Sequence, residues 1–306
     1  FMLGWGMRRI NNFEAAKQIG NEAYKRGSFI NGVHIDFAHR TFRWDSEASI
    51  KAHVHCVIVG FSLAPNRSKR KLFFSDENYK EVENINGYLI DGENVFVESR
   101  SKALCDVPIL GMGNQPIDGG NYLFATKEEA DAFVALEPKA SEYIKPWLGA
   151  QEFINGENRY CLWLGHCTPA ELRSMPHCLE RVENVRKLRM ESNRESTKKL
   201  ADYPTRFQTE NMPSSNYIVI PEVSSERRQY VPMGYLTPNV LCSNKLRLMP
   251  NATLFNFGVL NSNVHMAWMR AVCGRLKSDY RYSKDVVYNN FPWPTPTEEQ
   301  KAKIEQ

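Results

Sequence analysis

Two aromatic side chains stand among charged residues directly before an apolar run, and aromatic rings can bind a flat ligand. Phe42 and Trp44 lie in the stretch Thr41-Phe-Arg-Trp, and the apolar run 54–61 follows. An enzyme that acts on a nucleobase takes that base out of the helix and stacks it between aromatic or apolar side chains. The same spacing fits two rings that pack beneath a loop, so both interpretations stay open.

Three polar groups further along the chain have the residue types that contact DNA. Arginine can donate two hydrogen bonds to guanine, a carboxylate can accept from cytosine, and amides pair with adenine. Basic residues interleaved with aromatic ones suit phosphate contact and stacking. The first group is also consistent with an ordinary polar turn that holds an internal Glu–Arg pair. The candidates are Ser224, Ser225, Glu226, Arg227 and Arg228; Asn244, Lys245 and Arg247; and Lys277, Tyr280 and Arg281.

Two further basic stretches have a plainer alternative. Residues 66–71 form a basic loop that suits either a solvated linker or phosphate contact. Lys187, Arg194 and Lys198 share one face of a predicted helix, where neighbouring glutamates favour a salt-bridged surface instead.

Composition bounds the class of protein. The 306 residues carry a net charge of +4, which permits an anionic partner without requiring one. Seven cysteines without a Cys-x-x-Cys pair indicate reduced thiols in a cytoplasm rather than a zinc site. His53 and His55 have no third ligand nearby, so we expect no metal. There is no apolar run of transmembrane length, and we expect no membrane partner.

Periodicity and capping signals predict the elements that hold these groups. The β-branched apolar run 54–61 predicts a strand buried on both faces, and residues 33–38 predict its neighbour. Helices are predicted at 14–26, 127–136, 175–200 and 265–275, one opens at Pro169 behind the N-cap Thr168, and one follows the N-cap Thr297. A strand is predicted at 217–221, and the composition of residues 241–254 is typical of further β-strands.

Several stretches of the chain resemble one known family. They are Thr41-Phe-Arg-Trp, His53-Val-His-Cys-Val-Ile-Val-Gly-Phe61, and residues 87–97, 143–149, 223–228, 274–283 and 288–294. They resemble amino-methylating DNA methyltransferases, and the match is closest to the MmeI-like family of bacterial restriction-modification enzymes. It covers about residues 33–296. The resemblance implies that an aromatic before strand 54–61 stacks on a flipped adenine, and that residues 224–228 lie in the recognition domain. The proline-rich end and the last helix also resemble the proline-rich exit and spacer helix of type I specificity subunits.

Two motifs that such an enzyme needs do not occur in this sequence. One is the glycine-rich turn that receives S-adenosylmethionine, and the other is the Asn-Pro-Pro-aromatic loop that holds the adenine amino group. Phe1-Met-Leu-Gly-Trp-Gly has no strand before it, and Asn289-Asn-Phe-Pro-Trp-Pro has the right residue types in the wrong order. We therefore expect the C-terminal part of a larger enzyme, with no catalytic residue and no cofactor of its own. S-adenosylmethionine would bind the intact enzyme.

The expected fold is mixed α/β: the C-terminal edge of a methyltransferase-type sheet, then a β-rich target recognition domain and a C-terminal helical segment. The predicted boundaries are 1–62 for the catalytic remnant, 63–84 for a linker, 85–257 for target recognition and 258–306 for the helical or spacer segment. The expected function is sequence-specific recognition of double-stranded DNA for an adenine-N6 methyltransferase. The expected partner is the missing N-terminal methyltransferase region of the same protein, with or without a nuclease. The alternatives are a stand-alone DNA-specificity module and an unrelated two-domain enzyme.

Overall fold

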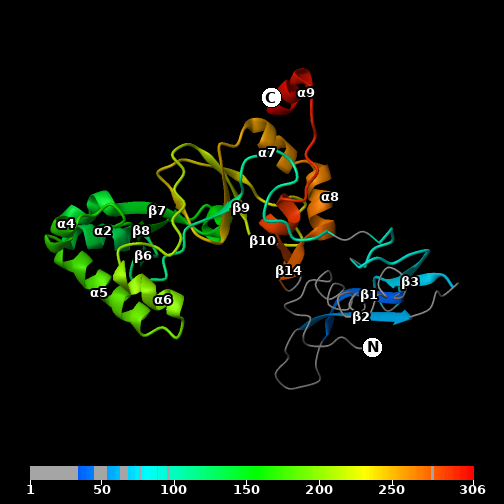
Figure 1. Cartoon of the computed structure of the whole chain (residues 1–306), viewed down its shortest axis with the longest axis horizontal. Helices are drawn as coiled ribbons and strands as arrows, with labels where there is room; N and C mark the ends of the chain where they lie inside the picture. Colours follow the sequence, from blue (N-terminus) through cyan, green and yellow to red (C-terminus); the bar gives the residue numbers. More distant parts are fainter. Residues whose placement is uncertain are drawn as a thin grey trace. The chain divides into compact units, whose positions relative to one another are not determined.

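The computed structural model describes residues 34–44, 54–62, 68–75, 77–87, 89–94, 97–276 and 279–306 (Figure 1). The predicted helix 14–26, residues His53 and Lys277, and the side chain of Trp44 lie outside this part. The chain forms two compact units, one of residues 1–106, 223–230 and 260–295, the other of 107–222, 231–259 and 296–306. The architecture is mixed α/β with a C-terminal helix, as predicted. No helix in the described ranges is long and apolar enough to cross a membrane.

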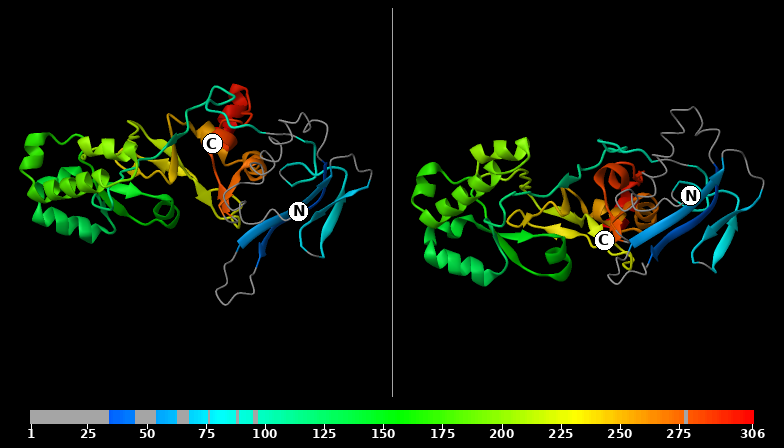
Figure 2. Two further views of the ribbon diagram at one scale, coloured as in Figure 1. Left: turned by 60° about the horizontal axis from the view of Figure 1, so that its bottom comes forward. Right: turned by 90° about the horizontal axis from the view of Figure 1, so that it is seen from below.

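The first unit contains a four-stranded sheet in the order β2-β1-β3-β4. Its strands are β1 (His34–Trp44), β2 (Val54–Ser62), β3 (Arg70–Phe73) and β4 (Tyr79–Val82). The two long strands β1 and β2 run antiparallel and lie side by side in both views of Figure 2. Strand β3 pairs parallel to β1, and its residues Arg70 and Lys71 belong to a strand instead of the basic loop predicted at 66–71.

Two expectations about this sheet are wrong. The strand expected at 33–38 continues to Trp44, so Phe42 lies within the strand, opposite Cys56. Strand β2 is not buried on both faces: Val57 and Val59 on one face are buried, whereas Cys56 and Ile58 on the other face are only half-buried. An antiparallel strand points successive side chains to opposite faces, and an apolar run alone does not show which of them are covered.

The same unit contains a small sheet that brings distant parts of the chain together. Its order is β10-β15-β14, with β10 (Val223–Ser224), β14 (Gly274–Leu276) and β15 (Asp279–Arg281). Helix α8 (Asn263–Val272) precedes β14 and is capped by Ser262. It begins two residues before the predicted start and ends before Gly274, where the backbone becomes extended. The short element η4 (Lys284–Tyr288) follows β15, and the Trp268 indole donates to the carbonyl of Val287 at 2.8 Å.

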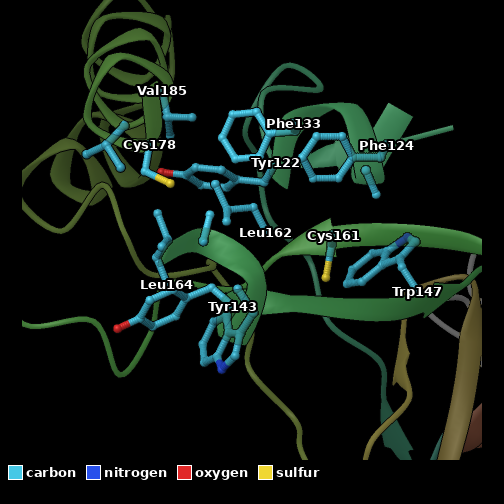
Figure 3. Packing of buried hydrophobic residues seen from close by; sticks show 14 of the residues in the cluster. Tyr122, Phe124, Phe133, Tyr143, Trp147, Cys161, Leu162, Leu164, Cys178 and Val185 are labelled. Atoms are coloured by element: carbon cyan, nitrogen blue, oxygen red, sulfur yellow. The ribbon is translucent and has the colours of Figure 1, made fainter. Parts of the chain in front are cut away.

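The second unit has a mixed sheet in the order β12-β7-β8-β6, covered by helices. Figure 3 shows Tyr122 between Phe133 and Leu162, with its hydroxyl end near Cys178 of α5. The sheet elements are β6 (Leu123–Phe124), β7 (Ile144–Leu148), β8 (Arg159–Leu162) and β12 (Leu241–Cys242). The helical elements are α2 (Lys127–Leu136), η2 (Pro138–Tyr143), α3 (Ala150–Asn155), α4 (Pro169–Arg173), α5 (Pro176–Met190), α6 (Glu195–Lys199) and η3 (Leu200–Asp202).

The long helix predicted at 175–200 is instead two helices, α5 and α6, with a break at residues 191–194. The predicted apolar stripe is confirmed in α5, where Val182 and Val185 are buried. Ser192 and Asn193 lie in the break, and short polar side chains of this kind compete with the helical backbone for hydrogen bonds. Lys198 of α6 pairs with Glu195 at 3.1 Å, in line with the salt-bridged alternative for this basic surface.

Helix α5 also carries an arginine that is completely buried. Arg189 has no exposed surface, and five hydrogen bonds from its guanidinium go to backbone carbonyls. Burial lowers the pKa of this guanidinium. The acceptors are Ile117 at 3.0 Å, Leu200 at 3.0 Å, Tyr203 at 3.1 Å, Pro116 at 2.7 Å and Arg206 at 2.9 Å.

An antiparallel sheet completes the second unit, in the order β11-β9-β13-β5. Its strands are β5 (Gly111–Met112), β9 (Tyr217–Pro221), β11 (Gly234–Leu236) and β13 (Leu246–Pro250). Every residue of the central strand β9 is buried. Helix α7 (Leu254–Leu260) follows the sheet, and helix α9 (Glu298–Glu305) begins behind the predicted cap Thr297.

Candidate nucleic-acid interface

Two of the predicted DNA-contacting groups are neighbours in the small sheet of the first unit. Strand β10 pairs antiparallel with β15, so Val223 lies opposite Arg281 and Ser224 opposite Tyr280. The polar turn 225–228 continues from β10, closed by a hydrogen bond from the Arg228 amide to the Ser225 carbonyl at 3.1 Å. The sheet therefore holds the turn beside the end of the β14–β15 hairpin.

The candidate side chains in this sheet differ in what they offer to a ligand. Glu226, Arg227, Arg228 and Arg281 are exposed, and Ser225 is half-buried. Ser224 is only 3% exposed, and Tyr280, at 9% exposed, lies with its ring 4.0 Å below the guanidinium carbon of Arg275. A buried hydroxyl and a covered ring cannot meet a base in this conformation, so the exposed charges carry the binding potential here.

Glu226 is attached to the hairpin at two points. Its amide donates to Oδ1 of Asp279 at 3.3 Å, and its carboxylate lies 3.8 Å from Nη1 of Arg275. The carboxylate is half-exposed, so this ion pair contributes little to stability. Sequence reasoning had considered a Glu–Arg pair within the turn but missed Arg275. The signal for it was the basic and aromatic stretch 274–283.

The third candidate group forms a tight turn between β12 and β13. The amide of Leu246 donates to the carbonyl of Ser243 at 2.9 Å, and the Ser243 hydroxyl accepts from the amide of Lys245 at 3.2 Å. Lys245 is exposed and Asn244 half-buried. These two side chains project from a turn whose flanking residues Cys242 and Leu246 are buried in the core.

Arg247 belongs to the same group but has a partner inside the protein. Its guanidinium lies 3.4 Å from the carboxylate of Glu222, and both side chains are less than one-fifth exposed. The Glu222 amide donates to the Lys245 carbonyl at 2.9 Å. Arg247 is thereby held against the sheet, whereas Lys245 is free to extend toward solvent.

A buried histidine supports the β14–β15 hairpin from α8. His265 has no exposed surface, and its Nε2 lies 2.8 Å from the hydroxyl of Tyr282, the residue after β15. Burial lowers the pKa of His265 to about 4, so the ring is neutral at pH 7. Burial also raises the pKa of Cys273, at the start of the hairpin, to about 11, which keeps the thiol protonated and unreactive.

The predicted stacking residues lie elsewhere in the first unit. Phe42 is half-buried in β1, with its ring centroid 6.4 Å from that of His39 in an edge-on arrangement. Trp44 ends β1 opposite Val54, and its side chain is outside the described part. Within that part, no group of three or more His, Cys, Asp or Glu residues is placed to hold a metal ion.

The chain is similar in sequence to two protein families and to a bacterial enzyme. A family described as "MmeI, target recognition domain" matches residues 91–295, and "MmeI, DNA-methyltransferase domain" matches residues 24–75. The chain is 40% identical over 297 residues to "DNA methyltransferase A" of Bacillus subtilis (strain 168), covering 97% of this chain and 33% of that protein. It therefore spans about a third of the length of this curated relative.

A solved structure resembles the whole chain closely. It is the type IIL restriction-modification enzyme MmeI in complex with DNA, and it superposes with a TM-score of 0.89 at 38% sequence identity. The match covers 96% of this chain and 40% of that protein.

Proposed function

The chain belongs to the MmeI family of DNA methyltransferases, and from this premise we propose that it reads the target sequence for an adenine-N6 methyltransferase of a restriction-modification system. The observation that carries the proposal is the match of 96% of this chain to a protein that was solved on DNA. The family's target recognition domain accounts for residues 91–295, where two of the exposed polar turns lie. We further propose that the enzyme acts on double-stranded DNA in the cytoplasm.

The candidate side chains differ in the part of the DNA that their chemistry suits. Contacts to base edges specify a sequence, and contacts to phosphates position the protein on the duplex. Residues 226–228 combine a carboxylate with two guanidinium groups, and residues 244–245 combine an amide with an ammonium group. These two turns are suited to base edges. Arg281 and Lys277 are suited to phosphates, and Phe42 or Trp44 to the flipped adenine.

Methyl transfer from S-adenosylmethionine would take place in another part of the intact enzyme. The cofactor's methionine end needs a close backbone approach at a glycine-rich turn. In the sheet of the first unit, Gly60 does not supply one: a Cβ there would meet the ring of Phe37 at 2.1 Å, so the space is filled by the protein itself. We propose that this chain alone binds no cofactor.

The predicted division into 1–62, 63–84, 85–257 and 258–306 also stays a proposal. It would separate a remnant of the catalytic domain, a linker, the target recognition domain and a spacer segment. Limited proteolysis of the chain, followed by mass spectrometry of the stable products, tests these boundaries. Cleavage concentrated within 63–84 and near 258 is the pattern that this division requires, whereas protection of β3 and β4, which bury Leu72 and Val82, would refute the linker.

The alternative is a DNA-specificity module that acts without a catalytic partner. It is supported by the same observation, the filled space at Gly60 in the sheet of the first unit. Selection of duplexes from a random library by this chain tests the reading function that both proposals share, and the expected result is one enriched sequence. Expression of the full-length protein separates them, because only the methyltransferase would leave N6-methyladenine within that sequence. No enrichment from the library would refute both.

A further inference from the structure

A buried asparagine touches the Asn244–Lys245 turn at several points. Asn114 has no exposed surface. Its carbonyl accepts from the amide of Asn244 at 2.8 Å, and its own amide donates to the carbonyl of Cys242 at 2.7 Å. The side-chain Nδ2 donates to that same carbonyl at 3.0 Å. The main chain of the turn is therefore attached on both sides of Ser243 to one residue.

The remaining hydrogen bonds of Asn114 attach it to a third segment. Its Nδ2 also donates to the carbonyl of Asn211 at 3.1 Å, and its Oδ1 accepts from the amide of Asn211 at 2.7 Å. Asn211 in turn donates from its side chain to the carbonyl of Met112 at 2.6 Å. An amide side chain supplies two donors and an acceptor, and this set of partners uses both kinds. Asn114 is thus fixed in place independently of the turn.

The residue before it allows the close approach. A Cβ on Gly113 would lie 2.1 Å from the carbonyl oxygen of Ser243 and 2.7 Å from that of Cys242. Both obstacles are backbone atoms of the turn, so no side-chain rotation could remove the clash. The Gly113 amide also donates to the carbonyl of Leu246 at 3.0 Å. Any larger residue at this position would push the turn away.

We propose that Gly113 and Asn114 form a clamp that positions the Asn244–Lys245 turn for base recognition, an inference that rests on the proposed function. The clamp residues touch the turn's backbone, so they set where its two side chains start without contacting DNA themselves. Recognition of a base edge needs its partner within about 0.5 Å of the productive position. A shift of the turn would therefore remove sequence discrimination while leaving phosphate contacts elsewhere intact.

The test compares variants of the whole chain in selection from a library of random DNA duplexes. Lys245→Ala and Asn244→Ala first identify the base positions that depend on the turn. Asn114→Asp, which keeps the shape but loses the Nδ2 donors, should then reduce discrimination at those same positions by roughly 5- to 150-fold, the span of one lost base contact. Gly113→Ala should act likewise, with the other base positions unchanged.

A buried asparagine away from the turn provides the matched control. Asn256 is 7% exposed, and its Oδ1 accepts from the amide of Thr253 at 2.9 Å and from its hydroxyl at 3.1 Å. Asn256→Asp keeps this Oδ1 acceptor and places the same new carboxylate at a buried site away from the turn, so it should leave the selected sequence unaltered. Amide hydrogen exchange at Asn244 supplies a second readout, and it should accelerate in Asn114→Asp but not in Asn256→Asp.

The outcomes separate this inference from the proposed function. If the unmodified chain selects no sequence, the proposed function fails. If it selects one and the folded Asn114→Asp and Gly113→Ala variants select the same one with equal discrimination, the clamp is refuted. Loss of folding in both variants would also count against it, because the pair would then support the whole unit rather than position one turn.

Discussion

Replacing Arg189 by methionine should destabilise the second unit by about 3–5 kcal/mol. Its five hydrogen bonds reach carbonyls in three separate segments: residues 116–117, 200–203 and 206. Two of the acceptors have another donor, because the Leu200 carbonyl also accepts from the amide of Tyr203 and the Tyr203 carbonyl from that of Arg206. The bonds to Pro116, Ile117 and Arg206 are the ones whose loss matters most.

The magnitude follows from those three carbonyls. A buried acceptor left without its donor destabilises by about 1–3 kcal/mol, so three give about 3–9 kcal/mol. Removing the buried cation returns part of this as desolvation energy. A return of about 1–3 kcal/mol from the middle of the range, about 6 kcal/mol, leaves about 3–5 kcal/mol. Arg189→Lys is expected to destabilise as well, since an ammonium has three donors and cannot reach five carbonyls arranged around a planar group.

Urea unfolding followed by circular dichroism measures the change. Arg186→Met is the matched control on the same helix, because Arg186 is 44% exposed and its ion pair with Glu183, at 3.4 Å, is a surface contact. Its effect should stay below about 1 kcal/mol. Equal midpoints for Arg189→Lys and the unmodified chain would refute the reasoning, since they would mean that the geometry of the guanidinium does not matter.

Three further outcomes are expected. Duplex binding should weaken steeply as the salt concentration rises. Arg281→Ala or Lys277→Ala should reduce the slope of log Kd against log salt by about 1 without changing the selected sequence. A salt-independent affinity would indicate a partner other than nucleic acid. Glu226→Lys should change the selected sequence, because it replaces an acceptor of cytosine's amino group by a donor suited to guanine. The same altered sequence in Arg275→Met would mean that Glu226 acts by holding Arg275. The pKa of His265 is about 4 in the folded chain and 6.5 in the unfolded chain, so the free energy of unfolding should fall by about 3 kcal/mol as the pH drops from 6.5 to 4. His265→Gln should remove that part of the pH dependence. An unchanged dependence of unfolding on pH in the variant would contradict the assignment.

The elements that were predicted well are those with local signals. Helix α2 and strand β9 begin and end at the predicted residues, and α4 and α9 begin behind Thr168 and Thr297, whose side chains accept from the third helical amide. A capping residue and a periodic apolar pattern act within a few residues of chain. The backbone therefore needs no distant partner to follow them.

What the sequence could not supply depends on contacts between distant segments. The pairing of β10 with β15 buries Ser224 and Tyr280, although both belong to polar or mixed stretches. Arg189 is surrounded by charged residues along the chain, yet it is completely buried because carbonyls from three other segments converge on it. The sequence also contains no indication of the role of Asn114. Its hydrogen-bond partners, Asn211 and Cys242, are far away along the chain, and the residues next to it show no motif.

We propose above all that the exposed turns 226–228 and 244–245 read a DNA sequence. A crystal structure of the full-length enzyme on the duplex selected by this chain tests it most directly. We expect side chains from both turns within hydrogen-bond distance of base edges in the major groove, and Arg281 against a phosphate. A duplex bound so that both turns face solvent would contradict the claim.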